Sequence, residues 1–141
     1  MDALALTILI LGLIALSIPI LMVIATWKIF EKASEPGWQA LIPFYNAYIL
    51  YKIAWKTQYF FLFLGCIGTI LIVTFIDFLS VFLFPLVLIA YAVIFFLKII
   101  LAHKLSTAFG HEIGFTLGLF FLEFIFLMIL GFGSSEYEGP Q

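Results

Sequence analysis

The sequence contains no arginine, a single cysteine and very few charged residues of either sign. Only 10% of the 141 residues are charged while 66% are hydrophobic, so polar side chains are too few to cover a water-facing surface. The net charge of −2 and the absence of arginine argue against a nucleic-acid partner. Because Cys66 is the only cysteine, neither an intramolecular disulfide nor a cysteine zinc cluster is available. The class that remains is an all-α integral membrane protein.

Four long apolar runs predict four transmembrane helices within a single domain, residues 1–141. We place them at about residues 3–26, 59–76, 78–97 and 113–132. At 1.5 Å per residue the first run extends about 36 Å, enough to cross a hydrocarbon core of about 30 Å. Only a tight turn at residues 77–80 separates the second and third runs, so these two helices are predicted to form an antiparallel hairpin.

All six lysines lie in two gaps between the apolar runs, residues 27–58 and 98–112. Basic residues in short loops are retained in the cytoplasm, whereas acidic residues have little effect on orientation. The opposite side of the predicted topology has Asp2, Asp77, Glu136 and Glu138 and no basic residue. The sequence therefore predicts that both termini are periplasmic and that both lysine-bearing gaps are cytoplasmic.

The segment 36–56 is predicted to lie along the inner membrane surface without crossing it. The uncharged stretch 38–51 is too short for a span of about 20 residues, and it is rich in rings that concentrate at the headgroup level. We expect a Pro-Gly turn, a short helical piece and an amphipathic interfacial helix from about Pro43 to Trp55. The basic and aromatic residues of this region are Lys28, Lys32, Trp38, Tyr45, Tyr48, Lys52, Trp55 and Lys56. Two roles stay open for them: they anchor the topology alone, or they also bind lipid headgroups or a cytoplasmic partner.

A distinctive stretch, WKIFEKASEPGWQALIPFYNAYILYKIA, occupies residues 27–54, and two further blocks lie at residues 108–122 and 129–133. These blocks resemble the motifs of a family of small bacterial multi-pass membrane proteins classed as a domain of unknown function. The resemblance implies a bacterial inner (plasma) membrane and supplies no activity. Some relatives have a signal-peptidase label, but this sequence has no extracytoplasmic serine–lysine pair to support that activity.

Glu123 is the one ionisable residue inside a predicted span, near its middle. An ionised carboxylate there costs at least ~2.5 kcal/mol, so such residues face a bundle interior or a water-filled cavity. We expect a neutral Glu123 facing the bundle or a subunit interface, hydrogen-bonded to Thr69, Thr74, Ser80, a tyrosine hydroxyl or a backbone carbonyl. A structural role and a role in proton or cation transport both stay open.

Gly110, Gly114 and Gly118 recur every four residues, continuing a series of small side chains from Ala102 and Ser106. Small residues at this spacing allow helices to approach closely in lipid. The series predicts a helix-packing face, either within the fold or between subunits.

The residues suited to chemistry are few. His103 and His111 lack a third metal ligand at suitable spacing, and position 115 is phenylalanine where the zinc motif begun by His111-Glu112 needs a second histidine. We predict no metal, no cofactor and no enzyme activity. The function we expect is an accessory or structural subunit that packs with membrane lipids and with itself or a larger membrane complex. The alternative is a small transporter or channel that uses Glu123.

Overall fold

The computed structural model describes the backbone of residues 2–141 and all of their side chains except those of residues 77–80. This part of the chain contains helices and no strand, as predicted for an all-α protein. The elements in order are α1 (Ala3–Lys32), the 3₁₀ helix η1 (Gly37–Leu41), α2 (Tyr45–Ala54), α3 (Thr57–Phe75), α4 (Asp77–Ala108), α5 (Ile113–Phe121) and α6 (Glu123–Phe132).

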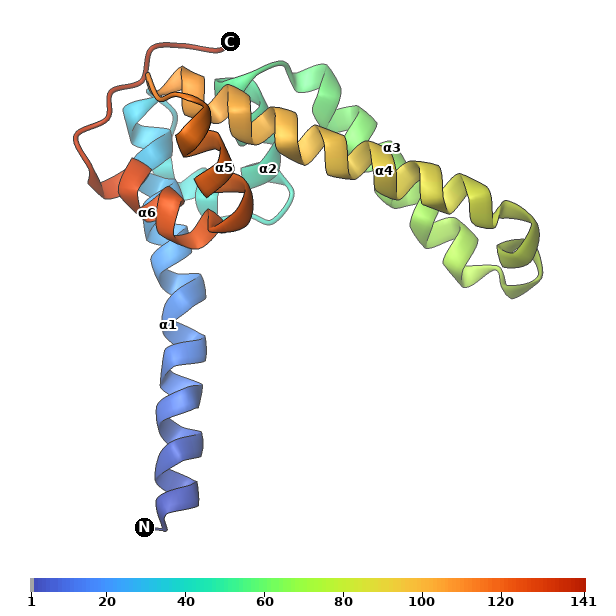
Figure 1. Ribbon diagram of the computed structural model, residues 1–141, viewed down its shortest axis with the longest axis horizontal. Helices are drawn as coiled ribbons and strands as arrows, with labels where there is room; N and C mark the ends of the chain where they lie inside the picture. The colour runs from blue at the N-terminus through green and yellow to red at the C-terminus, as the bar shows by residue number, and fades with distance from the viewer. Residues whose placement is uncertain (1) are drawn as a thin grey trace.

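The helices form a packed head from which two arms extend in different directions (Figure 1). The head consists of α1 from Ala25 onward, η1, α2, α4 from Leu101 onward, α5 and α6. One arm is residues 3–20 of α1, and the other is α3 with residues 81–97 of α4. The head has one apolar core made of Ile29, Phe30, Ala40, Ile49, Ile53, Ala54, Ala102, Leu105, Ala108, Phe109, Leu119, Leu127 and Leu130.

Three helical segments are long and apolar enough to cross a membrane: α1, α3 and residues 81–108 of α4. The predicted fourth span is not one helix. Residues 113–132 form the two short helices α5 and α6, which are separated at Leu122, where φ is −124° and ψ is 47°. The break makes Glu123 the first residue of α6. A carboxylate is favourable at a helix N-terminus and unfavourable in the middle of an apolar helix, so the break places Glu123 where its charge stabilises the helix.

The hairpin of α3 and α4 is present, but its bounds differ from the prediction. Ile76 alone separates the two helices, and the backbone of residues 77–80 is already helical. The predicted side-chain roles of Asp77 and Ser80 lie outside the described residues. α4 continues to Ala108, so most of the predicted gap 98–112 is helical, because Ala102, Leu105 and Ala108 bury one helix face in the head core.

Gly110 ends α4 in the left-handed conformation, with φ of +74°. The N–H of Gly110 donates to the carbonyl of Thr107 and that of His111 donates to Ser106, which is the Schellman pattern of a helix C-terminus. The tight cap lets the chain turn at once into α5.

The predicted helical pieces of segment 36–56 are present as η1 and α2, separated by the turn around Pro43. Their inner face belongs to the head, since Ala40, Ile49 and Ile53 are in the core. The Tyr51 ring is buried beside α3, and burial, with a smaller effect of Cys66, raises the pKa of its phenol to about 12. Whether this segment lies at a membrane surface stays a prediction.

The C-terminal tail, residues 133–141, lies across the head, whereas Asp2 is at the far end of the α1 arm (Figure 1). The Glu138 N–H donates to the Ala108 carbonyl at 2.7 Å, and the Gln141 N–H donates to Ala54 at 3.1 Å. The tail therefore contacts both lysine-bearing segments, while the membrane side on which each terminus lies stays a prediction. The tail reaches these segments because the chain reverses at Leu122, so that α6 ends beside Lys32 of α1.

Candidate functional site

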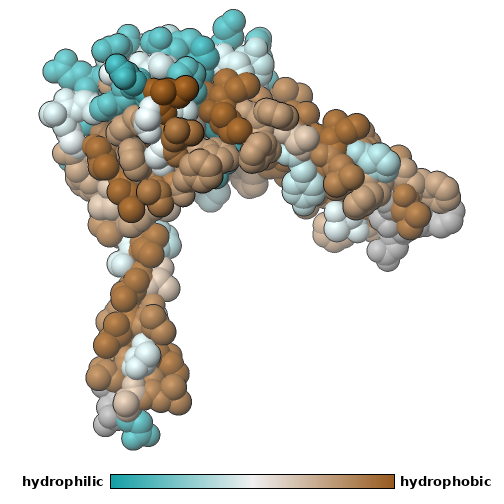
Figure 2. Space-filling view, in the orientation of Figure 1, coloured by the Kyte–Doolittle hydropathy of each residue, from teal (hydrophilic) through white to brown (hydrophobic). Residues whose placement is uncertain are grey.

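Polar residues gather on the side of the head away from the free ends of the arms, while both arms are apolar over most of the visible face (Figure 2). The predicted basic residues differ in their environments. Lys52 pairs with Glu35 at 2.5 Å, and this hydrogen bond raises the pKa of Lys52 against a smaller opposing effect of burial. Lys28 and Lys56 are exposed, so these two amines face the surroundings of the protein.

The predicted aromatic residues form two stacks at the base of the α3–α4 arm. Trp38, Tyr45 and Tyr48 follow one another with ring centroids 6.2 and 5.9 Å apart, and Tyr48 meets the edge of Phe60. Trp55 lies flat on Tyr59 at 3.5 Å. Such stacks fix η1 and α2 against the start of α3.

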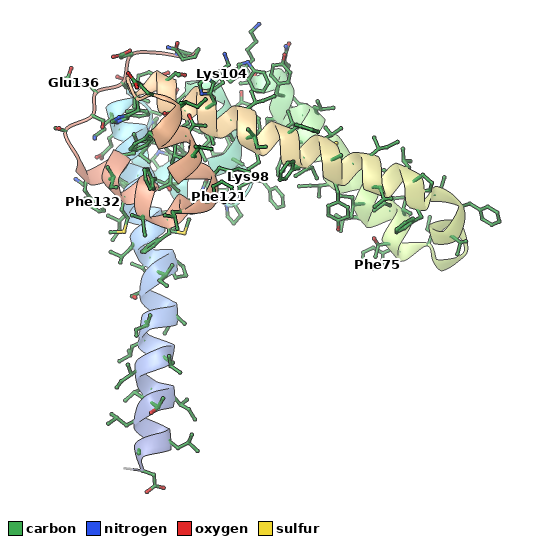
Figure 3. All side chains as sticks on the ribbon, viewed as in Figure 1. Phe75, Lys98, Lys104, Phe121, Phe132 and Glu136 are labelled. Carbon is green, nitrogen blue, oxygen red and sulfur yellow. The ribbon has the colours of Figure 1, made fainter. Side chains whose placement is uncertain are left out.

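The turn between α5 and α6 contains an ion pair. The Lys98 amine of α4 lies 3.2 Å from the Glu123 carboxylate, and both side chains are about half exposed, 54% and 45%. Lys98 lies at the inner corner between the head and the α3–α4 arm, whereas Lys104 and Glu136 lie on the outer side of the head (Figure 3). The expected interior position of Glu123 is therefore not observed, because the side chain is about half exposed and has Lys98 of α4 as its partner.

Two of the hydroxyl groups expected to bind Glu123, those of Thr69 and Thr74, have partners within their own helix. Thr69 donates to Gly65 and Thr74 donates to Ile70, each within α3. The sequence does not predict Lys98 as the partner of Glu123, because a continuous span at 113–132 places Glu123 deeper in the membrane than Lys98. A carboxylate in the middle of an apolar run was itself the available sign of a break.

A small cavity lies beside the ion pair. Its volume is ≈ 50 Å³, and its lining is Leu50, Lys98, Leu101, Ala102, Leu105, Leu119, Glu123 and Leu127. A space of this size is large enough for water beside the ion pair.

The other end of α6 is held by a lysine. The Lys32 amine donates to the carbonyl of Leu130 at 2.6 Å and to that of Gly133 at 2.8 Å. A cation at a helix C-terminus and an anion at its N-terminus both stabilise the helix through its dipole. Lys32 and Glu123 therefore complete a ten-residue apolar helix that is too short to cross a membrane.

The three glycines predicted to form a packing face have three different environments. Gly118 of α5 lies directly beneath the Phe126 ring of α6, so a side chain there would overlap that ring. Gly114 has open space, and Gly110 is the cap of α4. A close contact between two helix backbones involves a glycine outside the predicted series, Gly131 of α6, where an added Cβ would lie 2.6 Å from the Ala25 carbonyl oxygen of α1.

Both histidines take part in contacts within the head. His103 Nδ1 lies 3.1 Å from the Thr116 hydroxyl, and His111 Nε2 lies 2.7 Å from the Ser135 hydroxyl. The His111 ring also stacks on Phe115 at 4.0 Å. Among residues 2–141, leaving aside the side chains of 77–80, no three His, Cys, Asp or Glu residues are grouped as a metal ion requires.

One protein family matches most of this chain. The sequence profile described as a family of unknown function (DUF5684) matches residues 38–140, which begin at η1 and end in the C-terminal tail. All of α1 precedes the matched region. No curated protein and no solved structure matches the chain.

Proposed function

The chain belongs to the family of unknown function that matches residues 38–140, a membership that supplies no activity, and we propose that it is an accessory or structural membrane subunit. Its arms pack against further copies of the chain or against a larger membrane complex. The observation that supports this proposal is the α1 arm, in which every residue from 3 to 20 is exposed. A rigid head fixes the direction of this arm, as a subunit that presents a helix to a partner requires.

The proposed membrane is the bacterial inner membrane, with the head on its cytoplasmic side. All six lysines lie in the head or next to it, and basic residues near span ends remain in the cytoplasm. In this orientation residue 2 is periplasmic, α5 and α6 form a re-entrant hairpin, and the C-terminal tail is cytoplasmic. A membrane-impermeant maleimide should then label Asp2→Cys but not Ser134→Cys in intact cells, in a Cys66→Ala background. Labelling of Ser134→Cys would contradict the orientation.

Site-specific photo-cross-linking tests the subunit role. A photoreactive residue at Leu9 or Leu16 of the exposed α1 arm should give adducts of defined size in the native membrane. The same residue in place of His103, on the exposed surface of the head, is the matched control. A chain that stays monomeric at every protein-to-lipid ratio and gives no adduct from either α1 position would refute the proposal.

Transport through the Lys98–Glu123 pair is the second candidate, since buried or half-buried charges of opposite sign at a re-entrant turn occur in ion pathways. The cavity volume of ≈ 50 Å³ favours the structural role. Proton or potassium flux into liposomes, abolished by Glu123→Gln with the fold intact, would favour transport instead. We propose no catalytic step.

A further inference from the structure

A groove of ≈ 680 Å³ runs along α1 where the arm joins the head. Its lower wall has four apolar side chains of α1 between Pro19 and Ile24, and Leu41 of η1 forms the opposite wall. The lining continues to Glu31, so the groove extends about 18 Å along the helix at 1.5 Å per residue. That length is close to half of a hydrocarbon core of about 30 Å, which is the depth of one lipid leaflet.

The upper end of the groove is polar and contains Trp27, Lys28 and Glu31. The indole N–H of Trp27 donates to Glu31 Oε1 at 2.7 Å, so this carboxylate already has a partner. The Lys28 amine is exposed and forms no hydrogen bond or ion pair with the described side chains or backbone. A free ammonium above an apolar channel matches the charge and shape of an anionic amphiphile.

Gly37 determines the shape of the groove wall. A Cβ at this position would overlap the Trp27 indole, so only glycine lets the ring lie flat against the start of η1. Gly37 itself is buried, whereas Leu41, one turn further along η1, is exposed on the groove side. The groove is therefore a built feature of the α1–η1 contact and depends on one glycine.

We propose that this groove binds one anionic phospholipid from the leaflet that holds the head. The acyl chain lies along Pro19–Ile24 and Leu41, and the phosphate accepts a hydrogen bond from the Lys28 amine. The apolar lining favours an acyl chain, and the Lys28 ammonium, which has no partner among the described residues, favours an anionic headgroup over a zwitterionic one. Trp27 lies at the level of the headgroup, where indole rings are favoured.

Quenching of Trp27 fluorescence tests the proposal with the full-length chain. In a Trp38→Phe/Trp55→Phe background Trp27 is the only tryptophan. The protein is reconstituted in phosphatidylcholine vesicles with equal, small fractions of either brominated phosphatidylglycerol or brominated phosphatidylcholine. We expect phosphatidylglycerol to quench Trp27 several-fold more strongly, because it is concentrated in the groove.

Three variants separate charge from shape. Lys28→Gln should abolish the preference for phosphatidylglycerol, while Lys56→Gln, an exposed lysine outside the groove, should leave it unchanged. Glu31→Gln keeps an acceptor for Trp27 and removes a negative charge near the phosphate, so the preference should increase. Gly37→Ala should reduce quenching by both lipids, because the indole must move from its place on η1.

Two outcomes would overturn the proposal. Equal quenching by the two brominated lipids in the chain with Lys28 would mean that the groove holds only bulk lipid. No quenching by either lipid would mean that protein, such as a second copy of the chain, covers the groove. If Lys28→Gln fails to fold by circular dichroism, the opposite change expected for Glu31→Gln still decides the question.

Discussion

The head and the α1 arm both contain many large apolar side chains, but these side chains are packed in the head and exposed in the arm. In the head Leu130 is fully buried, whereas Leu13 in the arm is 60% exposed. The head also has hydrogen bonds between distant elements, such as Lys32 to Leu130 and Gly133. Apolar residues alone therefore do not make a core in this protein. The core forms where glycine permits close approach and where charges complete the ends of short helices.

The strongest way to test this contrast is to remove the same side-chain atoms from both regions. Leu130→Ala should lower the free energy of unfolding by about 2–5 kcal/mol, because it leaves a cavity in the head core. Leu13→Ala should change it by less than about 0.5 kcal/mol, since the side chain has no packed surroundings. Denaturant titration in detergent, followed by tryptophan fluorescence, measures both. Equal effects would show that the α1 arm is packed in the same way as the head.

Glycine substitutions give a second comparison with a smaller expected effect. An added methyl group at Gly131 meets the Ala25 backbone and should destabilise the α1–α6 crossing by about 1–3 kcal/mol. At Gly12, in the arm, nothing lies within 4 Å, and alanine is the better helix former by up to about 1 kcal/mol. Gly131→Ala should therefore lower the melting temperature, and Gly12→Ala should raise it or leave it unchanged. A lower value for both would contradict this account.

The same contrast explains which elements were predictable from the sequence. The α3–α4 hairpin and the pieces η1 and α2 follow from local features, namely uncharged runs, prolines and the length limit on a span. The break at Leu122 is not marked by a glycine or proline, since none lies between Leu119 and Met128, and its local sign is the Glu123 carboxylate within an apolar run. It is decided by tertiary contacts of α6, with Lys98 at one end and Lys32 at the other.

The C-terminal end of α4 was also not predicted, although here the sequence does contain a local sign of the helix. Lys98, His103 and Lys104 suggested a loop, although Ala102, Leu105 and Ala108 lie at the spacing of one helix face. A charged surface on one side of a helix is compatible with a buried face on the other. The sequence predicts that Gly110 belongs to a packing series, whereas its positive φ makes it the C-terminal cap of α4.

The smallest predicted effect concerns the contact between the C-terminal tail and the head. The Tyr137 hydroxyl donates at 2.6 Å to the carbonyl of Ile53, in the last turn of α2, where helix carbonyls lack partners within the helix. Tyr137→Phe keeps the ring contact with Phe109 and removes this donor. The loss should be about 1 kcal/mol, or roughly fivefold faster removal of the tail by carboxypeptidase. Tyr59→Phe, which leaves the tail contacts intact, should have no effect on this rate.

The tail contact should also depend on pH in a defined direction. Burial, and to a smaller extent Glu35, raises the pKa of Tyr137 above its usual 10.0, so the docked tail favours the neutral phenol. The contribution of the Tyr137 hydrogen bond to docking of the tail is complete below pH 10. This contribution is lost as the pH rises through the raised pKa, because a phenolate cannot donate to Ile53. Tail cleavage in the unmodified chain should accelerate in that range, while Tyr137→Phe should have no corresponding step. An identical alkaline profile for the two proteins would mean that the backbone bonds of Glu138 and Gln141 alone hold the tail.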